Sequence, residues 1–268
     1  MIGAIVGDIL GSRFEWNNIK TKDFELFTPK CRPTDDSIMT LALAQAILKS
    51  QPDGSDLSKN AVTWMQALGR NYPDAGYGGR FHRWIFSRVP QPYNSFGNGA
   101  AMRVSPVGFA ASSLEEAKEL ARKVTEVTHN HPEGIKAAEA TASAIYLART
   151  GKSLSELRKF IHENYYPMDF TLDEIRDSYR FDVTCQGSVP QAFMAFFAST
   201  SFEDAIRNAI SIGGDSDTIA AICGGIAEAY YGVPDAIRER ALTFLDARLT
   251  QILTAFESKY PPVTEKAR

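Results

Sequence analysis

The sequence has little cysteine, and the three cysteines it has are far apart. Cys31, Cys185 and Cys223 form no short-spaced pair, which argues against both a disulfide framework and a zinc ribbon. No apolar run reaches the roughly 20 residues that a membrane-spanning helix needs. The N-terminal segment has no basic region, and Asp8 interrupts its apolar stretch, unlike a signal peptide. We therefore expect a protein of the reducing cytoplasm with no membrane partner.

The chain also lacks an excess of basic residues. Its formal net charge is −3, whereas affinity for nucleic acids comes mainly from clustered Lys and Arg. A dedicated nucleic-acid binder is therefore not expected, although a local basic pocket for one small anionic ligand stays open. With 268 residues, of which 44% are hydrophobic, the chain can bury a substantial core.

Alternating apolar and polar strand patterns are nearly absent. Capping residues followed by apolar stripes instead predict helices near 113–127, 133–150, 190–197, 217–231 and 234–256, with further helix starts at Ser153, Thr171 and Ser201. No linker rich in Pro, Gly or Ser divides the chain. We expect an all-α, compact single domain over residues 1–260, with a frayed tail over residues 261–268.

Two stretches need a separate interpretation. Residues 3–15 read as an apolar helix that ends at Glu15, and the regular glycine spacing within it allows close contact with another helix. Residues 70–105 form the longest weakly patterned region and are rich in glycine and aromatic residues. Long loops in compact domains are usually functional or disordered, and aromatic side chains disfavour disorder. We therefore expect ordered ligand-binding loops there.

Two acidic clusters, one near each end of the sequence, repeat one pattern. Thr34-Asp35-Asp36-Ser37 and Gly213-Gly214-Asp215-Ser216-Asp217-Thr218 both place hydroxyl and carboxylate oxygens at an expected helix start. Helix capping is the commoner explanation for either cluster alone. It does not explain four carboxylates and two threonines at two such starts. Because hard divalent cations prefer oxygen ligands, the two clusters together predict one dinuclear metal site.

Glycine-rich loops provide a second group of candidates. Two runs, one ending in Arg80 and one in Arg103, could bind an anion through backbone amides, although tight turns between helices are the alternative; their glycines are Gly76, Gly78, Gly79, Gly97 and Gly99. Phe96 could present its ring to a base or belong to the core. His129 could contact a phosphate or a hydroxyl; zinc binding with His131 is disfavoured, because no third soft ligand lies nearby.

Taken in order, these motifs resemble the ADP-ribosylglycohydrolase family, relatives of the dinitrogenase reductase-activating glycohydrolase, from Gly3 to about Pro234. The resemblance is carried by Gly7-Asp8 with Gly11 and Glu15, Thr34-Asp35-Asp36-Ser37, Gly97-Asn98-Gly99-Ala100-Ala101-Met102-Arg103, Thr128-His129 and Gly214-Asp215-Ser216-Asp217-Thr218. It implies a compact orthogonal helical bundle of the ADP-ribosylglycohydrolase type. It also implies two Mg²⁺ ions, or Mn²⁺, with ligands at Thr34, Asp35, Asp36, Asp215, Asp217 and Thr218.

The resemblance further implies where ADP-ribose binds. The diphosphate and the distal sugar would be held by Gly78, Gly79, Ser95, Phe96, Gly97 and Asn98, and His129 would contact the same ligand. Glu15 corresponds to a glutamate proposed to gate the cleft. Ser37 replaces a threonine of many members and keeps the hydroxyl, whereas Phe96 replaces a tyrosine of some relatives and loses one ligand hydrogen bond. The implied partner is an ADP-ribosylated protein or another conjugate, an ADP-ribosylated base included, and a monomer is expected.

The implied activity is metal-dependent hydrolysis of the glycosidic bond at the anomeric carbon, releasing ADP-ribose from an arginine, a serine or another acceptor. Two ions would clamp the ribose hydroxyls and activate a water, and a carboxylate would act as base. We favour Glu15 for serine-type linkages and Asp35 otherwise, with Asp74 as a third candidate. Two alternatives stay open: a non-catalytic module that binds ADP-ribose or a nucleotide, and a dinuclear phosphoesterase, which would yield AMP.

Overall fold

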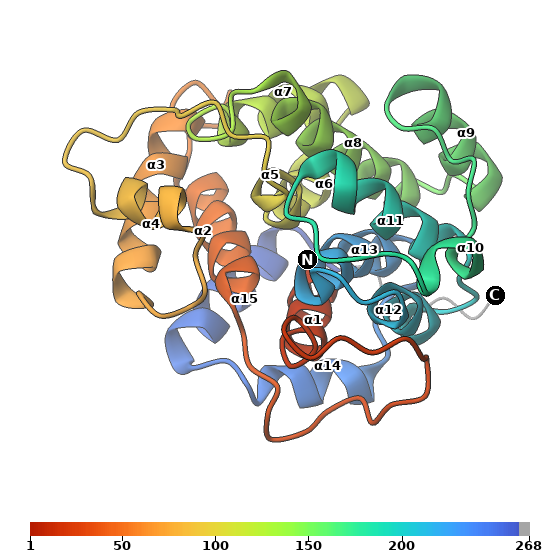
Figure 1. Ribbon diagram of the computed structural model, residues 1–268. Coiled ribbons are helices and arrows are strands. Elements are labelled where there is room, and N and C mark those ends of the chain that lie inside the picture. The colour runs from red at the N-terminus through yellow and green to blue at the C-terminus, as the bar shows by residue number, and fades with distance from the viewer. Residues whose placement is uncertain (263–268) are drawn as a thin grey trace.

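The computed structural model describes residues 1–262, and all regular structure in this part is helical. The only pairing of extended backbone among these residues is an isolated bridge between Gly97 and Thr184. The prediction of an all-helical single domain is thus confirmed (Figure 1). The helices are α1 (Ile2–Gly11), α2 (Asp35–Lys49), α3 (Leu57–Asn71), α4 (Gly79–Phe86), α5 (Gly99–Met102), α6 (Ser105–Ala110), α7 (Leu114–Thr125), α8 (Pro132–Arg149), α9 (Leu154–Asn164), α10 (Leu172–Arg176), α11 (Cys185–Phe197), α12 (Phe202–Ser211), α13 (Ser216–Tyr231), α14 (Asp235–Leu242) and α15 (Ala247–Lys259).

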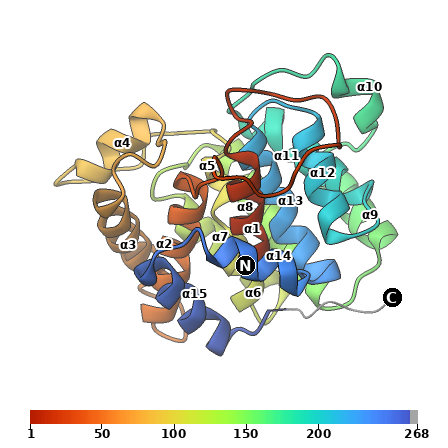
Figure 2. The same ribbon diagram turned by 90° about the horizontal axis from the view of Figure 1, so that it is seen from below.

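Helices α1 and α13 lie side by side near the middle of the molecule (Figures 1 and 2). Every residue of α1 is buried, and so is every residue of α13 except the last. A Cβ atom on Gly7 would lie 2.0 Å from the carbonyl oxygen of Ala220, and one on Gly11 would lie 2.5 Å from the Cα of Asp217. Only glycine fits at such a distance. The glycine spacing of α1 therefore places its C-terminal end directly against the N-terminus of α13.

The remaining helices surround this central pair. Helices α2, α8, α11 and α12 pack around it, α3 and α4 extend from the outer side of α2, and α15 covers another part of α2. The residues of the central helices are apolar almost throughout, which makes this region the core of the domain. Among residues 1–262, no helix combines the length and the apolar character required to cross a bilayer.

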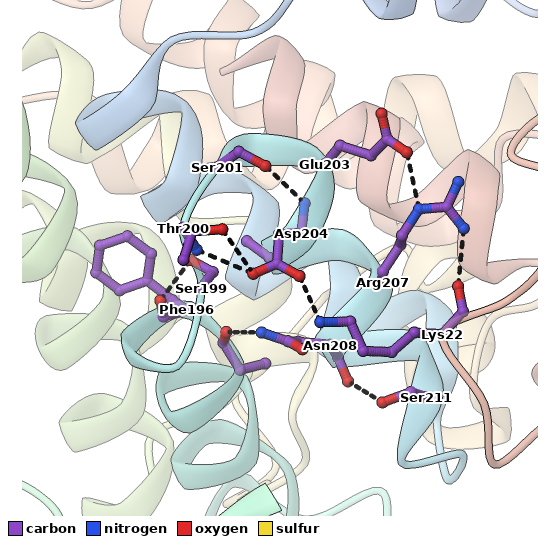
Figure 3. Close-up of polar contacts among 12 residues, drawn as sticks. Lys22, Phe196, Ser199, Thr200, Ser201, Glu203, Asp204, Arg207, Asn208 and Ser211 are labelled. Carbon is purple, nitrogen blue, oxygen red and sulfur yellow. Dashed lines mark hydrogen bonds and ion pairs between the residues drawn. The ribbon is translucent and has the colours of Figure 1, made fainter. Parts of the chain in front are cut away.

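The segment between α1 and α2 contains no helix and arches past α12 before it returns to α2 (Figure 2). Two side chains of α12 fasten it (Figure 3). Asp204 forms an ion pair with Lys22, and Arg207 donates to the backbone carbonyls of Lys22 and Phe24, each at 2.8 Å. These contacts hold the segment that carries Glu15 against the body of the protein.

Four predicted helix starts are confirmed by their capping contacts. Ser113, Ser153, Thr171 and Ser201 each accept a hydrogen bond from the backbone N–H three residues later. At Ser153 and Thr171 the reciprocal contact from the glutamate is present as well, which completes a capping box. The capping pattern of the sequence therefore located these helices to within a residue or two.

Three predictions of element boundaries were wrong. The single helix expected over 234–256 is two helices, α14 and α15, because Asp246 caps a new start by accepting from the backbone N–H of Leu249 at 2.9 Å. Residues 70–105 are not loops throughout, since they contain α4 and α5. Helix α1 ends at Gly11 rather than at Glu15. Directly after Gly11, the hydroxyl of Ser12 donates to the carbonyl of Ile9 at 2.8 Å. The expected tail 261–268 falls mostly on residues 263–268, outside the described residues.

Candidate functional site

The N-termini of α2 and α13 meet, as the two acidic clusters predicted. The hydroxyl of Thr218 donates to Asp36 Oδ2 at 3.3 Å, although the two residues are 182 positions apart in the chain. Two groups of three carboxylates each have oxygens that lie within 4.8 Å of one another inside the group, and Asp217 belongs to both groups. The two groups are Asp8, Asp36 and Asp217, and Glu15, Asp215 and Asp217. Five carboxylates therefore form one continuous cluster.

Asp8 of α1 orients the start of α2. Its carboxylate accepts from the backbone N–H and hydroxyl of Thr34, at 2.9 and 2.6 Å, and from the backbone N–H of Ser37 at 3.0 Å. The Ser37 hydroxyl donates to it as well. Burial raises the pKa of Asp8, and these hydrogen bonds oppose the rise. An aspartate inside an apolar helix is thus explained, because four donors satisfy its buried oxygens.

Asp36 and Asp217 are buried without a counterion. Only 2% of Asp36 and 3% of Asp217 is exposed, and Asp36 Oδ1 has no hydrogen-bond partner. Among residues 1–262, no ion pair joins either carboxylate to a Lys or Arg side chain. Burial, and then their mutual or neighbouring charges, raises the pKa of both groups well above the usual range. Such carboxylates need a proton or a cation.

Asp215 stands at the N-cap position of α13, where its side chain makes no capping hydrogen bond, and it links the cluster to one of the glycine loops. It accepts from the side-chain amide of Asn98 at 2.7 Å, and its carboxyl group shares a hydrogen bond with that of Asp217. Two carboxylates can share such a contact only when a proton or a cation lies between them. Burial raises the pKa of Asp215, and the hydrogen bond from Asn98 opposes that rise. The oxygen-only donor set and the unsatisfied oxygen of Asp36 fit a hard divalent cation.

Glu15 and Asp35 are the two less buried carboxylates at this end. Burial, followed by the charge of Asp215, raises the pKa of Glu15 to about 7. Burial, followed by the charge of Asp8, raises the pKa of Asp35 to about 8. Asn18 holds the Glu15 segment in place, because its amide donates to the carbonyl of Gly214 at 2.9 Å and accepts from the Gly214 N–H at 2.8 Å. Both carboxyl groups can exchange a proton near neutral pH.

A cavity of about 420 Å³ opens beside the carboxylate cluster. Most of the predicted site residues line it, and they come from both acidic clusters, both glycine loops and the histidine turn. They are Glu15, Asp35, Asp36, Gly78, Gly79, Ser95, Gly97, Asn98, His129, Asp215, Asp217 and Thr218. The volume lies in the range that small-molecule sites occupy. The sequence therefore identified residues that the fold brings together from segments far apart in the chain.

Two predicted site residues lie outside this lining. Thr34 faces Asp8 rather than the cavity. Phe96 is 42% exposed, so it does not belong to the core, and its ring centroid lies 5.2 Å from that of His131. Asp74, the third candidate base, lines a separate hollow together with Asp246.

Part of the cavity lining is basic. Arg103 is buried, donates to the hydroxyl of Thr128 at 2.6 Å and lies 3.2 Å from Nδ1 of His129. Burial lowers the pKa of Arg103 to about 10, and burial together with the charge of Arg103 lowers the pKa of His129 well below its usual range. The histidine is therefore neutral beside a buried cation. A Cβ atom on Gly99 would lie 3.3 Å from its Nε2, so a glycine leaves room for the ring.

Sequence reasoning missed three apolar residues of the cavity. Trp16, Phe181 and Val183 line it next to Glu15 and Asp215. They come from two segments without regular structure that lie far apart in the sequence. No periodicity marks such residues, and their exposure becomes visible only in the fold.

Comparison with known proteins agrees with this architecture. The sequence profile of the ADP-ribosylglycohydrolase family matches residues 1–261. The ADP-ribosylhydrolase ARH3 of Homo sapiens is 27% identical to the chain, over 87% of this chain and 84% of that protein. The ADP-ribosylarginine hydrolase Tri1 of Pseudomonas putida (strain GB-1) is 26% identical, over 87% of this chain and 70% of that protein. A solved structure described as an ADP-ribosylglycohydrolase-related protein complex has a TM-score of 0.67 and 25% identity, covering 95% of this chain and 93% of that one.

Proposed function

The chain belongs to the ADP-ribosylglycohydrolase family, and on that premise we propose that it is a metal-dependent ADP-ribosylhydrolase. It would cleave the bond between the anomeric carbon of ADP-ribose and an acceptor, such as a protein side chain, and release ADP-ribose. The observation that carries the proposal is the meeting of five carboxylates from three segments beside a cavity whose lining also includes Arg80 and Arg103. Acidic and basic side chains around one cavity suit a ligand that needs both cations for its sugar and positive charge for its phosphates.

Two divalent cations, Mg²⁺ or Mn²⁺, would be held by Thr34, Asp35, Asp36, Asp215, Asp217 and Thr218. Bound there, the cations supply Lewis acidity and orient the hydroxyls of the sugar. The Thr34 hydroxyl donates its proton to Asp8 and accepts from the backbone N–H of Asp36 at 3.4 Å, so its oxygen keeps one lone pair for a cation. The unsatisfied Oδ1 of Asp36 supports the same assignment.

Backbone amides and basic side chains would hold the diphosphate and the distal sugar. Helix α4 begins at Gly79 without a side-chain cap or an acidic residue in its first turn, so its amides are free for an anion. A Cβ atom on Gly78 would meet nothing within 4 Å, which means that packing within the protein does not require a glycine there. In the proposed function, the close approach of a ligand would require it. Ser95, Phe96, Gly97, Asn98 and His129 would complete this end of the site.

In the proposed reaction, the oxygen of a water bonds to the anomeric carbon, the bond from that carbon to the acceptor breaks, and the acceptor leaves with a proton. A carboxylate takes a proton from the water and, once protonated, supplies the proton with which the acceptor leaves. Glu15 would do so for serine-type linkages and Asp35 for others, since both side chains line the cavity beside the proposed cations.

The test is incubation of the purified protein with ADP-ribosylated proteins in the presence of Mg²⁺ or Mn²⁺, followed by identification of the products. Free ADP-ribose supports the proposal, AMP would support a phosphoesterase, and tight ADP-ribose binding without turnover would support a binding module. Asp36→Ala and Asp217→Ala should each abolish both metal binding and turnover. Asp235→Ala is the matched control, because Asp235 is also an acid in the first turn of a helix but is exposed and away from the cavity.

A further inference from the structure

A second hollow adjoins the cavity on the side of α4. It has a volume of about 240 Å³ and is lined by Arg80, Arg83, Trp84, Ser87, Gln91 and Tyr93. We call this space the basic hollow. Arg80 and Tyr93 also line the cavity beside the carboxylates, so the two spaces share part of their walls. None of the carboxylates proposed to bind metal lines the basic hollow.

The segment that forms the basic hollow carries charge of one sign. Residues 75–114 contain four arginines and no Asp or Glu, although the net charge of the whole chain is −3. Within residues 1–262, no carboxylate forms an ion pair with any of these arginines. Two of the four, Arg80 and Arg83, line the basic hollow. Positive charge that is not balanced by the protein, and that lies in a hollow, favours an anion.

The lining residues share one face of α4. Arg80, Arg83 and Trp84 stand at positions i, i+3 and i+4, and Ser87 follows at i+7. A Cβ atom on Gly79 would lie 3.9 Å from Nη1 of Arg83, so this guanidinium reaches back towards the first residue of the helix. The backbone amides proposed to hold the diphosphate and the basic hollow therefore belong to adjacent parts of one helix.

Two donors of the basic hollow have no partner within the described residues. The guanidinium of Arg83 makes no hydrogen bond and no ion pair there. The indole N–H of Trp84 has no acceptor either, although only 4% of this residue is exposed. Arg80, by contrast, donates to the backbone carbonyl of Tyr93. Because a buried donor without an acceptor costs free energy, the oxygens of an anion would stabilise this part of the protein.

We propose that the basic hollow binds a phosphate attached to the adenosine ribose of the ligand, so that the preferred ligand is ADP-ribose with a third phosphate. This inference rests on the proposed function, because it extends the same ligand beyond its diphosphate. A phosphate monoester presents three acceptor oxygens, which match the fork of a guanidinium and further N–H donors. A nucleic acid would require basic side chains along a longer path than one hollow.

The experiment compares two ligands by titration calorimetry in the presence of Mg²⁺: ADP-ribose, and ADP-ribose with a phosphate on the 2′-hydroxyl of its adenosine. The wild-type protein should bind the phosphorylated ligand about tenfold more tightly, the ratio that one hydrogen bond to a charged group provides. Arg83→Ala should remove this gain with little effect on ADP-ribose, because Arg83 lines the basic hollow but not the cavity. Arg83→Lys should keep part of the gain, since it keeps the charge and loses the fork.

Arg88→Ala is the matched control. Arg88 belongs to the same segment without acidic residues and is exposed, but it lines neither space, so the gain should persist in this variant. A loss as large as that of Arg83→Ala would mean that the charge of the whole segment attracts the phosphate, and the inference would be overturned. Equal weakening of both ligands by Arg83→Ala would overturn it as well, because Arg83 would then serve the diphosphate.

The outcomes also separate this inference from the proposed function. If the wild-type protein binds ADP-ribose but shows no gain from the third phosphate, the assignment of the basic hollow alone is wrong. If neither ligand binds with Mg²⁺ or with Mn²⁺, and no conjugate releases ADP-ribose, the proposed function itself fails.

Discussion

At the scale of single residues, the site depends on a carboxylate that does not line the cavity. Asp8 is fully buried, and every hydrogen bond that it accepts comes from the first turn of α2 or its cap. Its neighbours in that turn, Asp35 and Asp36, face the cavity. Asp8 therefore acts through α2: it fixes the turn that presents two of the proposed ligands, and its charge is balanced by donors rather than by a Lys or Arg.

We expect Asp8→Asn to destabilise the protein and to weaken metal binding. Asparagine keeps the size of the side chain, but its NH₂ group would face donors from Thr34 and Ser37. Losing hydrogen bonds to a buried charge should lower the free energy of unfolding by about 3 kcal/mol. Urea unfolding measures this change, and titration calorimetry with Mn²⁺ measures the affinity. Asp235→Asn, on the exposed first turn of α14, serves as control; equal effects of the two substitutions would contradict the role of Asp8.

At the scale of elements, the contact between α1 and α13 sets the geometry of the site. Gly3, Gly7 and Gly11 each lie against the backbone of α13, so the end of α1 with Asp8 and the start of α13 with Asp217 are held at a fixed distance. A helix pair in backbone contact cannot be moved apart without opening the core. The carboxylates thus meet on rigid elements, as a precise metal site requires.

Gly7→Ala should therefore destabilise the fold and disturb the site together. The added Cβ would lie 2.0 Å from a backbone carbonyl oxygen of α13, and backbone cannot rotate away as a side chain can. We expect a loss of about 3 kcal/mol in the free energy of unfolding, at the upper end for an overpacked core. The control is Gly78→Ala, where a Cβ atom has nothing within 4 Å. A Gly7→Ala protein as stable as this control would show that the two helices can separate at little cost.

The elements also show which helix boundaries and contacts can be predicted from the sequence. The caps at Ser153 and Thr171 are local signals, and they located their helices correctly. The glycines of α1 correctly predicted a close helix contact, because their spacing is itself the signal. The break between α14 and α15 was missed, since Asp246 as a cap competes with a continuous apolar stripe and only tertiary packing decides between them.

The same distinction between local patterns and tertiary packing explains which contacts at the site could be predicted from the sequence. Asp36 and Asp217 were predictable as partners, because each cluster repeats the chemistry of the other. The pairing of Trp16 with Phe181 was not, because two irregular segments meet there and neither carries a periodic pattern. The chemistry of one cluster can be predicted from adjacent residues, whereas contacts between loops depend on how the whole core is assembled.

At the scale of the whole molecule, the lining of the cavity contains both acidic and basic side chains. Five carboxylates line the cavity, with Asp8 behind them, and the same lining includes Arg103, which is buried and, among residues 1–262, has no ion-pair partner. Neither arrangement favours folding by itself. On the proposed function, bound cations and a phosphate-bearing ligand would balance these charges. The stability of the folded chain should therefore depend on what occupies the cavity.

This dependence should appear as an effect of pH. The folded-state pKa values of Glu15 and Asp35 are raised to about 7 and about 8, and those of Asp36 and Asp217 are raised well above the usual range. The corresponding values in the unfolded chain are about 4. A carboxyl group whose pKa is raised by folding binds its proton more tightly in the folded state. Its contribution to stability is full below about pH 4 and is lost as the pH rises through the folded-state value.

The metal-free protein should consequently lose stability between about pH 5 and about pH 8, and a divalent cation should restore it by taking the place of the protons. The gain in Tm on adding Mg²⁺ or Mn²⁺ to protein treated with a chelator should therefore grow with pH over this range. Scanning calorimetry at several pH values, with chelator or with metal, measures both trends. Asp36→Asn should flatten the fall of the metal-free Tm, because an amide has no proton to lose there. A metal-induced gain that is the same at every pH would mean that protons and cations do not compete for these carboxylates, and the cluster would then not be the metal site.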